Sequence, residues 1–530
     1  MAKTAPGTGS QSPHTPVTRQ LARPVFSQPS PTEDPTTFRI KHASDTAAYD
    51  AIAALNQQHK LHAMPFPPPR GGTEPQLTLG QVLGDIDASP KNIRAAAATQ
   101  IEVIEKAGQI VFHSLGDCGS TNGPASQNEV VDKLLGDFKE SRPFEIPQFH
   151  FLLGDVVYSF GETQYYYDQF YEPYRDYPAP IIAAAGNHDG MISPLAGAKS
   201  LEAYLRNFCA ENFVVTPEAG GLSRTAQIQP GVFFTFEAPF VRIVTLYSNV
   251  LEDPGVISDE NTGSSQLDFL EAALNRVKSD KFAGALLFAD HHPPFTAGRH
   301  GWSVQMLAQI DKLCTKTGVW PHAFLSGHAH NYQRFTRTRN ADKTQIPYIV
   351  CGNGGHNHQP LSKSGGHTIR APQIIQKAGD KTDLVVLENY DDQNYGYLRV
   401  VVTKTQLRIE YHPASDGTWT KAPDDSVTVD LATGRIPRRE SQGSLGDAPP
   451  PPRTSWVTLA HSDSFREMPV ALAVPPIEEP SRRSPNRPPG FFCPRPDTNE
   501  PGRPGSKSSG FRNGYNDRNR NRSREIFPCR

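Results

Sequence analysis

Five short apolar segments in the middle of the chain each end in Asp, Asn or His side chains. They read QIVFHSLGD (109–117), FHFLLGD (149–155), PIIAAAGNHD (180–189), ALLFADHH (285–292) and AFLSGHAH (323–330). Apolar runs of this length, bounded by glycine or proline, are typical of buried β-strands. Amphipathic segments between them, for example 127–140 and 264–281, predict helices. The alternation predicts an α/β core from residue 109 to about 413.

Three further stretches predict additional strands in this core. They are IPYIVCGNGG (346–355), a hairpin-like segment at 231–249 and a late meander at 395–413. In layered α/β proteins, ligands gather at the carboxyl ends of strands. The polar residues that end the five segments are therefore expected to meet at one edge of the core.

The two ends of the chain differ in composition from this core. Residues 1–43 are rich in Pro, Ser and Thr and are interpreted as a disordered leader. Residues 44–108 are interpreted as a helical lead-in, with two helix patterns separated by PFPPPRGG. The α/β domain is predicted at 109–415, a connecting segment at 416–435, and a disordered tail rich in Pro and Arg at 436–530.

Charge is distributed unevenly between the tail and the rest of the chain. The tail has 16 Lys and Arg against 10 Asp and Glu, a net charge of +6, whereas the whole chain carries −2, so residues 1–435 carry −8. An acidic body does not favour a nucleic-acid groove. The basic tail is able to contact anions, and its partners are not identified by the sequence.

Nothing in the sequence predicts insertion in a membrane. No segment has the roughly 20 consecutive apolar residues of a membrane span, and the first residues lack the pattern of a secretory signal. The six cysteines are scattered without close pairs, which suits reduced thiols better than a disulfide framework. The sequence therefore predicts a soluble, cytoplasmic protein, and export by a route without a signal peptide stays open.

The residue types at the strand ends are those of a metal site. Carboxylates, an amide oxygen, a phenol and imidazoles are ligands of metals such as Fe, Mn and Zn. One such residue alone is commonly part of a turn or of the core. Several in order, each after an apolar strand, are much harder to explain without a metal. The candidates are Asp117, Asp155, Tyr158, Asn187, His188, Asp189, His291, His292, His328 and His330.

Taken in order, these motifs resemble those of the calcineurin-like metallophosphoesterases. The Asp-Cys-Gly of the first motif, the tyrosine three residues after Asp155 and the sequence GHAHNYQRF resemble the purple acid phosphatase branch in particular. The resemblance covers about 109–413 and implies a layered α/β/β/α sandwich of two mixed β-sheets flanked by helices. Gln333 departs from the pattern, because that branch commonly has Glu at this position.

The resemblance implies a dinuclear metal centre. A ferric ion would be held by Asp117, Asp155, Tyr158 and His330. A divalent ion (Zn, Mn or Fe) would be held by Asp155, Asn187, His291 and His328, with Asp155 bridging the two ions. His291 is preferred to its neighbour His292 as the ligand because it satisfies His-x-Pro with Pro293.

Such a centre predicts a hydrolase of phosphate esters, with a phosphomonoesterase of the acid phosphatase type as the favoured function. Two cations about 3.5 Å apart lower the pKa of a shared water, so that hydroxide can attack phosphorus in line near neutral pH. Protonation of the leaving group and stabilisation of the phosphoryl oxygens suit His188, His292 and His300. Asp189 is expected to orient His188. The substrate would be a small phosphate ester or a phosphorylated molecule.

Two other functions stay open. The first is a phosphodiesterase or nucleotide hydrolase with two Mn or two Zn ions, in which Tyr158 is only packed beside the site. The second is a noncatalytic scaffold that recruits partners through the tail, for example through PPPP at 449–452. His356 and His358, in a loop rich in Gly and His, are interpreted as polar loop residues.

Overall fold

The computed structural model describes most of the chain between residues 47 and 437. The described residues are 47, 49–52, 54, 64–85, 90–139, 142–193, 197–250, 253–298, 300–361, 369–379, 382–414 and 422–437. All of them belong to the first of the two units into which the chain divides, Met1–Gly446. The predicted leader at 1–43 and the predicted tail from residue 438 onward lie outside the described residues, so both stay predictions.

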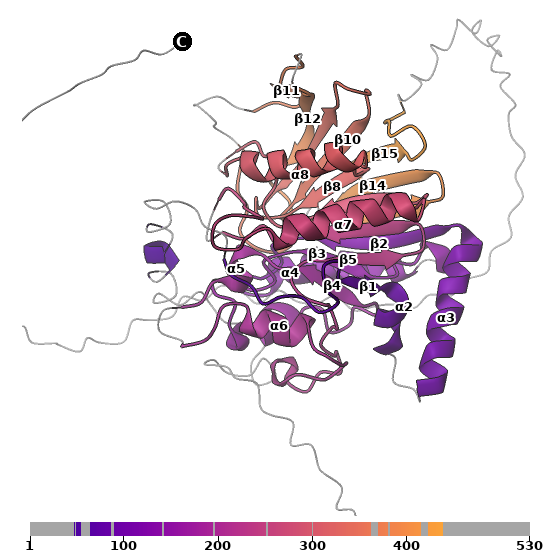
Figure 1. Ribbon diagram of the computed structural model, residues 1–530. Coiled ribbons are helices and arrows are strands. Elements are labelled where there is room, and N and C mark those ends of the chain that lie inside the picture. Colours follow the sequence, from indigo (N-terminus) through magenta and orange to yellow (C-terminus); the bar gives the residue numbers. More distant parts are fainter. Residues whose placement is uncertain are drawn as a thin grey trace, which may run out of the picture. The chain divides into compact units, whose positions relative to one another are not determined.

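Two mixed β-sheets form the centre of this unit (Figure 1). The nine-stranded sheet has, in spatial order, β1 (Gln76–Thr78), β5 (Phe234–Ala238), β6 (Val241–Thr245), β7 (Ala285–Ala289), β8 (Ala323–Ser326), β10 (Gln345–Cys351), β9 (Tyr332–Thr338), β12 (Leu384–Asp391) and β11 (Gln373–Gln376). The six-stranded sheet has β15 (Asp425–Asp430), β14 (Gln406–Pro413), β13 (Gly396–Thr403), β2 (Gln109–Leu115), β3 (His150–Leu153) and β4 (Ile181–Ala184).

The parallel strands lie where the sequence predicted the core. In one sheet β6, β7, β8 and β10 are parallel neighbours, and in the other β2, β3 and β4 are. Phe149, which precedes β3, contacts Phe236 of β5 with 4.9 Å between ring centroids. This contact joins the two sheets, because each ring comes from a different one.

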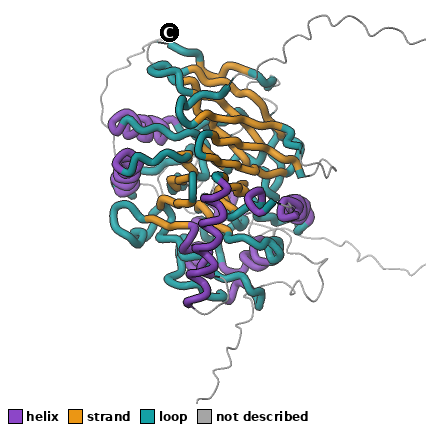
Figure 2. Tube along the Cα trace, turned by 90° about the vertical axis from the view of Figure 1, so that its right-hand side faces the viewer, coloured by secondary structure: helices purple, strands orange, loops and turns teal. Residues whose placement is uncertain are grey.

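Helices flank the strands, as the purple helices beside the orange strands in Figure 2 show. The α-helices are α2 (Leu79–Val82), α3 (Pro90–Ala107), α4 (Ala125–Gly136), α5 (Asn187–Gly190), α6 (Glu202–Phe208), α7 (Ser265–Ser279) and α8 (Val304–Thr317). Short 3-10 turns lie at Leu83–Asp85, Asp137–Lys139, Pro143–Glu145, Thr163–Tyr165 and Pro217–Ala219, and a π-helical turn lies at Tyr167–Tyr171. Two mixed sheets flanked by helices confirm the predicted fold class. Among the described residues, no helix is long and apolar enough to cross a membrane.

All eight stretches predicted as strands are strands in the structure. The hairpin-like segment forms β5 and β6, which pair antiparallel, and the late meander forms β13 and β14. Two strands lie outside the predicted domain limits of 109–415. β1, in the lead-in, pairs with β5, and β15, in the predicted connecting segment, pairs with β14. Both flanking segments therefore take part in the sheets.

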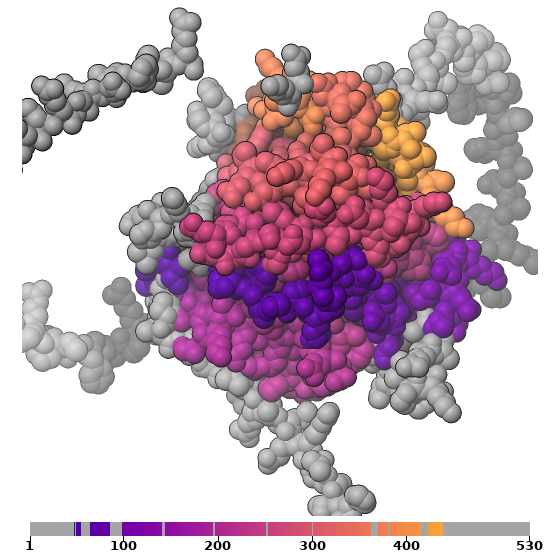
Figure 3. Space-filling model, viewed as in Figure 1, coloured from indigo at the N-terminus to yellow at the C-terminus, as the bar shows by residue number. Residues whose placement is uncertain are grey.

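The lead-in also packs along the domain beyond β1. Figure 3 shows it as an indigo and purple band across one face. Arg70 donates to the carbonyl oxygens of Cys209 (2.8 Å) and Gln229 (2.8 Å), and the Phe66 ring packs edge-on against Tyr247 at 5.6 Å. The PFPPPRGG sequence that interrupts the helical pattern thus has a structural role, because it fixes the lead-in on the domain.

His150 of β3 is a buried histidine whose ring makes no hydrogen bond with the described part of the chain. Neither ring nitrogen has a hydrogen-bond partner among the described residues, and the rings of Tyr174 and Tyr177 lie 5.6 and 5.3 Å away. Burial lowers the pKa of His150 well below its usual value. The unfolded chain, with a histidine pKa of about 6.5, therefore binds more protons than the folded one. Stability is retained above about pH 6.5 and is lost as the pH falls below it.

Replacement of His150 by Phe is expected to stabilise the protein. The substitution removes two unpaired polar atoms, which raises the free energy of unfolding by about 1 to 2 kcal/mol near neutral pH, and by more at acidic pH because no proton is taken up on unfolding. Denaturant melts at about pH 7.5 and about pH 5.5 measure both effects. His113→Phe is the control. It is expected to destabilise, since the His113 nitrogens contact Tyr177 (2.9 Å) and Asp137 (3.0 Å). A less stable His150→Phe variant at both pH values would contradict the prediction.

Candidate metal centre

The candidate residues follow the carboxyl ends of strands from both sheets. In the six-stranded sheet, Asp117 follows β2, Asp155 follows β3, and α5 follows β4 directly (Figure 1). In the nine-stranded sheet, His291 follows β7 and His328 follows β8. The sequence predicted one edge where these ends meet, and in the structure the two sheets together supply it.

Three of these residues have an unusual backbone conformation. The φ angles of Asp117 (56°), Asp155 (52°) and His328 (67°) lie in the left-handed region, and each residue follows a glycine. Left-handed backbone is uncommon for residues other than glycine and is concentrated at functional sites. Close packing explains another glycine of the motifs, since a Cβ on Gly186 would lie 2.1 Å from Asp155 Oδ1.

Asp117, Tyr158 and His330 form the first cluster. The Tyr158 hydroxyl donates to Asp117 Oδ1 at 2.8 Å and lies 3.4 Å from His330 Nε2, and His330 Nε2 lies 3.4 Å from the same carboxylate oxygen. Tyr158 and Asp117 are fully buried. Burial and the charges of Asp117 and Asp155 raise the pKa of the Tyr158 phenol well above its usual value.

Asp155, Asn187 and His291 form the second cluster. His291 Nε2 lies 3.0 Å from Asn187 Oδ1 and 3.3 Å from Asp155 Oδ2. The other ring nitrogen, Nδ1, lies 2.8 Å from the carbonyl oxygen of Leu153, which can only accept a hydrogen bond. In neutral His291 the proton is therefore on Nδ1, and Nε2 turns a lone pair toward two oxygens. In that state His291 Nε2, Asn187 Oδ1 and Asp155 Oδ2 are three acceptor atoms close to one another.

These groups fit a cation. Ligand atoms of Asp117, Asp155 and His291 all lie within 4.8 Å of one another, and Asp155 Oδ2 is buried without a hydrogen-bond partner among the described residues. Burial alone would lower the pKa of His291, but the charges of Asp155 and Asp117 outweigh it and raise that pKa to about 10. The field in the cluster thus favours positive charge, whether a proton or a metal ion. Carboxylate, amide and imidazole donors suit Fe, Mn or Zn.

His328 contacts both clusters and also a third group, formed by Asp253 and His300. Its backbone N–H donates to Asp117 Oδ2 at 2.7 Å, and its ring lies 5.1 Å from the ring of His291. Its Nε2 lies 3.8 Å from Asp253 Oδ1, and Asp253 also lies 3.3 Å from His300 Nδ1. All seven residues predicted as metal ligands are therefore in one region, since each contacts at least one other.

The other predicted residues lie around this region. His188 donates its backbone N–H to Asp155 Oδ1 at 2.9 Å, and its ring lies 4.4 Å from that of Tyr158. The His292 ring lies 4.2 Å from that of His328 at an angle of 43°, and its Nδ1 lies 3.2 Å from Ser248 Oγ. The structure thus places His291 among the carboxylates and His292 beside them.

The expected contact between Asp189 and His188 is wrong. Asp189 accepts the backbone N–H groups of Gly186 (2.8 Å) and Val156 (3.1 Å), whereas His188 Nδ1 bonds the carbonyl oxygen of Ser159 at 2.7 Å. Burial and the charge of Asp155 raise the pKa of Asp189 to about 8. Asp189 therefore fixes the backbone around the centre and does not orient the imidazole.

Sequence reasoning missed two residues that contact the centre. The Asp253 carboxylate contacts ring nitrogens of His300 and His328. The His356 ring stacks on Tyr158 with 3.7 Å between ring centroids and 3° between planes. Asp253 belongs to no motif and does not end a predicted strand, so nothing in the sequence identified it. His356 follows β10, a predicted strand, and its position after a strand end was the signal that its interpretation as a polar loop residue left unused.

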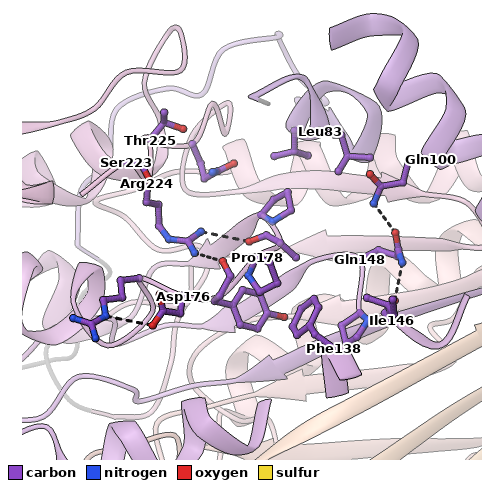
Figure 4. Close-up of a pocket in the computed structure, with 17 residues that line it drawn as sticks. Leu83, Gln100, Phe138, Ile146, Gln148, Asp176, Pro178, Ser223, Arg224 and Thr225 are labelled. Atoms are coloured by element: carbon purple, nitrogen blue, oxygen red, sulfur yellow. Dashed lines mark hydrogen bonds and ion pairs between the residues drawn. The ribbon is translucent and has the colours of Figure 1, made fainter. Parts of the chain in front are cut away.

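A cavity of about 490 Å³ lies elsewhere in the fold (Figure 4). It is lined by residues that precede β3 and β4, such as Gln148 and Pro178, and so lies at the strand ends opposite to the metal centre. Some of its polar side chains are held by hydrogen bonds within the protein. Arg224 donates to the Tyr174 carbonyl at 2.9 Å, and Gln100 donates to Gln148 at 2.7 Å.

Comparison with solved structures finds several proteins of low sequence identity. GAP50, the anchor in the inner membrane complex of Plasmodium, has 14% identity and a TM-score of 0.39, and the match covers 63% of this chain and 90% of that one. PhoD has 13% identity and a TM-score of 0.38, with 64% and 73% covered. A dimetal phosphatase from Danio rerio has 11% identity and a TM-score of 0.34, with 61% and 99% covered. A search of curated proteins finds no match.

Comparison with protein families gives a match to the calcineurin-like phosphoesterases over residues 112–332. That region contains all seven predicted ligands, the strands β3, β4, β7 and β8, and the second half of β2. It thus contains the carboxylates, the asparagine and the histidines of the candidate centre, and residues 112–332 are similar to the calcineurin-like phosphoesterase family.

Proposed function

We propose that this protein hydrolyses phosphate esters at a dinuclear metal centre, as a phosphomonoesterase of the acid phosphatase type. The observation that carries the proposal is the convergence of acceptor atoms from Asp155, Asn187 and His291 in a buried cluster, next to the cluster of Asp117, Tyr158 and His330. Acceptors are brought together in this way where a cation is to be bound.

The donor sets suggest which ion each cluster would hold. Asp117, Tyr158 and His330, with Asp155, offer hard oxygen donors and one imidazole, which suits a ferric ion. Asp155, Asn187, His291 and His328 suit a divalent ion such as Zn, Mn or Fe. Such a pair would supply Lewis-acid activation of water and offset the negative charge of the phosphoryl group. Asp155 belongs to both sets and is the proposed bridge.

Three histidines are positioned to act on the substrate. His188 bonds Ser159 through Nδ1, which leaves Nε2 for a phosphoryl oxygen. His292 is fixed by Ser248. His300 lies between Asp253 and Gln359, whose Oε1 is 2.8 Å from His300 Nε2. We assign to His292 and His300 the donation of hydrogen bonds or a proton to the leaving oxygen, for which His300 Nε2 has to exchange Gln359 Oε1 for that oxygen.

Asp253→Asn is expected to slow the reaction most for poor leaving groups. Asp253 orients His300, so its loss should impair protonation of the leaving oxygen. An alkyl phosphate is expected to lose about 10²-fold in kcat and a nitrophenyl phosphate, which needs little protonation, less than about 10-fold. Steady-state kinetics on both substrates measure the difference. Glu260→Gln, outside the clusters, is the control, and equal losses on the two substrates would contradict the assignment.

Purified full-length protein tests the function as a whole. We expect turnover of a phosphomonoester in the metal-loaded protein, loss of turnover after chelation, and visible colour with iron bound. No turnover with any of Fe, Zn or Mn would contradict the proposal. Colourless protein that is active with only Mn or Zn, and prefers diesters or nucleotides, would favour the alternative hydrolase in which Tyr158 is not a ligand. Loss of function on removal of residues 436–530 would favour a function of the tail.

A further inference from the structure

His356 contacts every residue of the first cluster, which consists of Asp117, Tyr158 and His330. Its ring lies parallel to that of Tyr158, with centroids 3.7 Å and planes 3° apart, and edge-on to that of His330 at 4.9 Å. Its backbone N–H donates to the carbonyl oxygen of Asp117 at 3.0 Å. No other ring contact of Tyr158 among the described residues is as close or as parallel.

The His356 ring is held in place by the loop that carries Asp117. Its Nδ1 lies 3.1 Å from the carbonyl oxygen of Gly119, which can only accept, so Nδ1 carries the proton and the ring orientation is set. The preceding Gly355 has φ 156°, and a Cβ there would lie 2.6 Å from the Cys118 carbonyl oxygen. Glycine at this position lets the loop after β10 approach closely enough for the stack to form.

Two imidazoles contact the ring of Tyr158. The His188 ring lies 4.4 Å away at an angle of 46°, and the His356 ring lies parallel at 3.7 Å. Gln169 holds the backbone of Tyr158 through two hydrogen bonds, and the ring contacts with the hydrogen bond of the hydroxyl to Asp117 orient the side chain. Movement of the ring would move that oxygen away from Asp117 and His330.

We propose that His356 is a positioning residue for Tyr158. The His356 ring would hold the plane of the phenol so that the phenol oxygen can bind the proposed ferric ion. The inference rests on the proposed function for the identity of that ion. A residue that only filled space would contribute to folding and leave the geometry of the Tyr158 oxygen unchanged. A positioning residue changes how that oxygen binds.

The test uses three variants of the full chain. His356→Ala removes the stack, and His356→Phe restores a flat ring without the hydrogen bond to Gly119. His358→Ala is the matched control, because His358 lies in the same loop but stacks on Tyr395 at 3.9 Å. The readouts are the phenolate-to-iron absorption band of the iron-loaded protein, its iron retention, and the position of Tyr158 in a crystal structure of the metal-free protein.

We expect His356→Ala to shift the absorption band, to retain iron about 10-fold less tightly and to show the Tyr158 ring displaced or in two conformers. His356→Phe should return the ring position and most of the band, and His358→Ala should match the wild type. An undisplaced Tyr158 ring in metal-free His356→Ala would overturn the inference. A wild-type protein without the band would overturn the ferric site instead, and the metal-free structures would still decide the role of His356.

Discussion

Asp155→Asn is expected to abolish the hydrolysis of phosphate esters while the fold is kept. The carboxylate is buried, with Oδ2 3.3 Å from His291 Nε2 and Oδ1 accepting the His188 N–H at 2.9 Å. Asparagine has nearly the same shape but carries no charge, and its amide group would turn a donor or a weak acceptor toward the ions. We expect kcat to fall by about 10³-fold or more and the metal content to fall below two ions per chain.

Kinetics with elemental analysis of the purified variant measures both effects, and circular dichroism checks the fold. Asp176→Asn is the control, since this acid lines the cavity at the opposite strand ends (Figure 4). It should keep wild-type activity and metal content. An Asp155→Asn variant with two bound ions and undiminished turnover would exclude Asp155 as the bridge.

Five of the strands that the sequence predicted are buried along nearly their whole length. β2, β3, β4, β7 and β8 are therefore mostly apolar on both faces, with a few polar residues such as His150. β12 alternates between buried and partly exposed residues and contains Glu388 and Asn389, so it lacks that pattern. β1 has three residues, and pairing with β5 stabilises it rather than its own composition. Partly exposed strands such as β12 and very short ones such as β1 depend on tertiary contacts, which the sequence pattern does not reveal.

The same distinction applies to the candidate site. The seven predicted ligands could be found because a buried strand places whatever follows it at a common edge. Asp253 follows no predicted strand, and its contacts with His300 and His328 depend on how distant loops meet. Asp189 was identified but given the wrong partner, because the backbone N–H groups of Gly186 and Val156 reach its carboxylate before a side chain does.

Tyr158→Phe is expected to bleach the iron-loaded protein. A phenolate bound to a ferric ion gives the visible absorption, and phenylalanine keeps the ring that stacks on His356 and His188 but lacks the oxygen. The variant should retain less iron relative to Zn or Mn, because one hard donor is lost. In the metal-free protein the lost hydrogen bond to Asp117 should lower the free energy of unfolding by about 1 kcal/mol.

Tyr332→Phe separates the loss of a buried hydroxyl from the loss of a ligand. Tyr332 is also buried, stacks on Tyr411 at 3.9 Å and donates to Asp425 at 2.9 Å, outside the metal centre. Its replacement should cost a similar free energy of unfolding and leave colour and metal content unchanged. Equal colour in wild type and Tyr158→Phe would show that Tyr158 is only packed beside the site. Bleaching in Tyr158→Phe but not in Tyr332→Phe would show that the Tyr158 hydroxyl is what allows the centre to hold a ferric ion instead of two divalent ions.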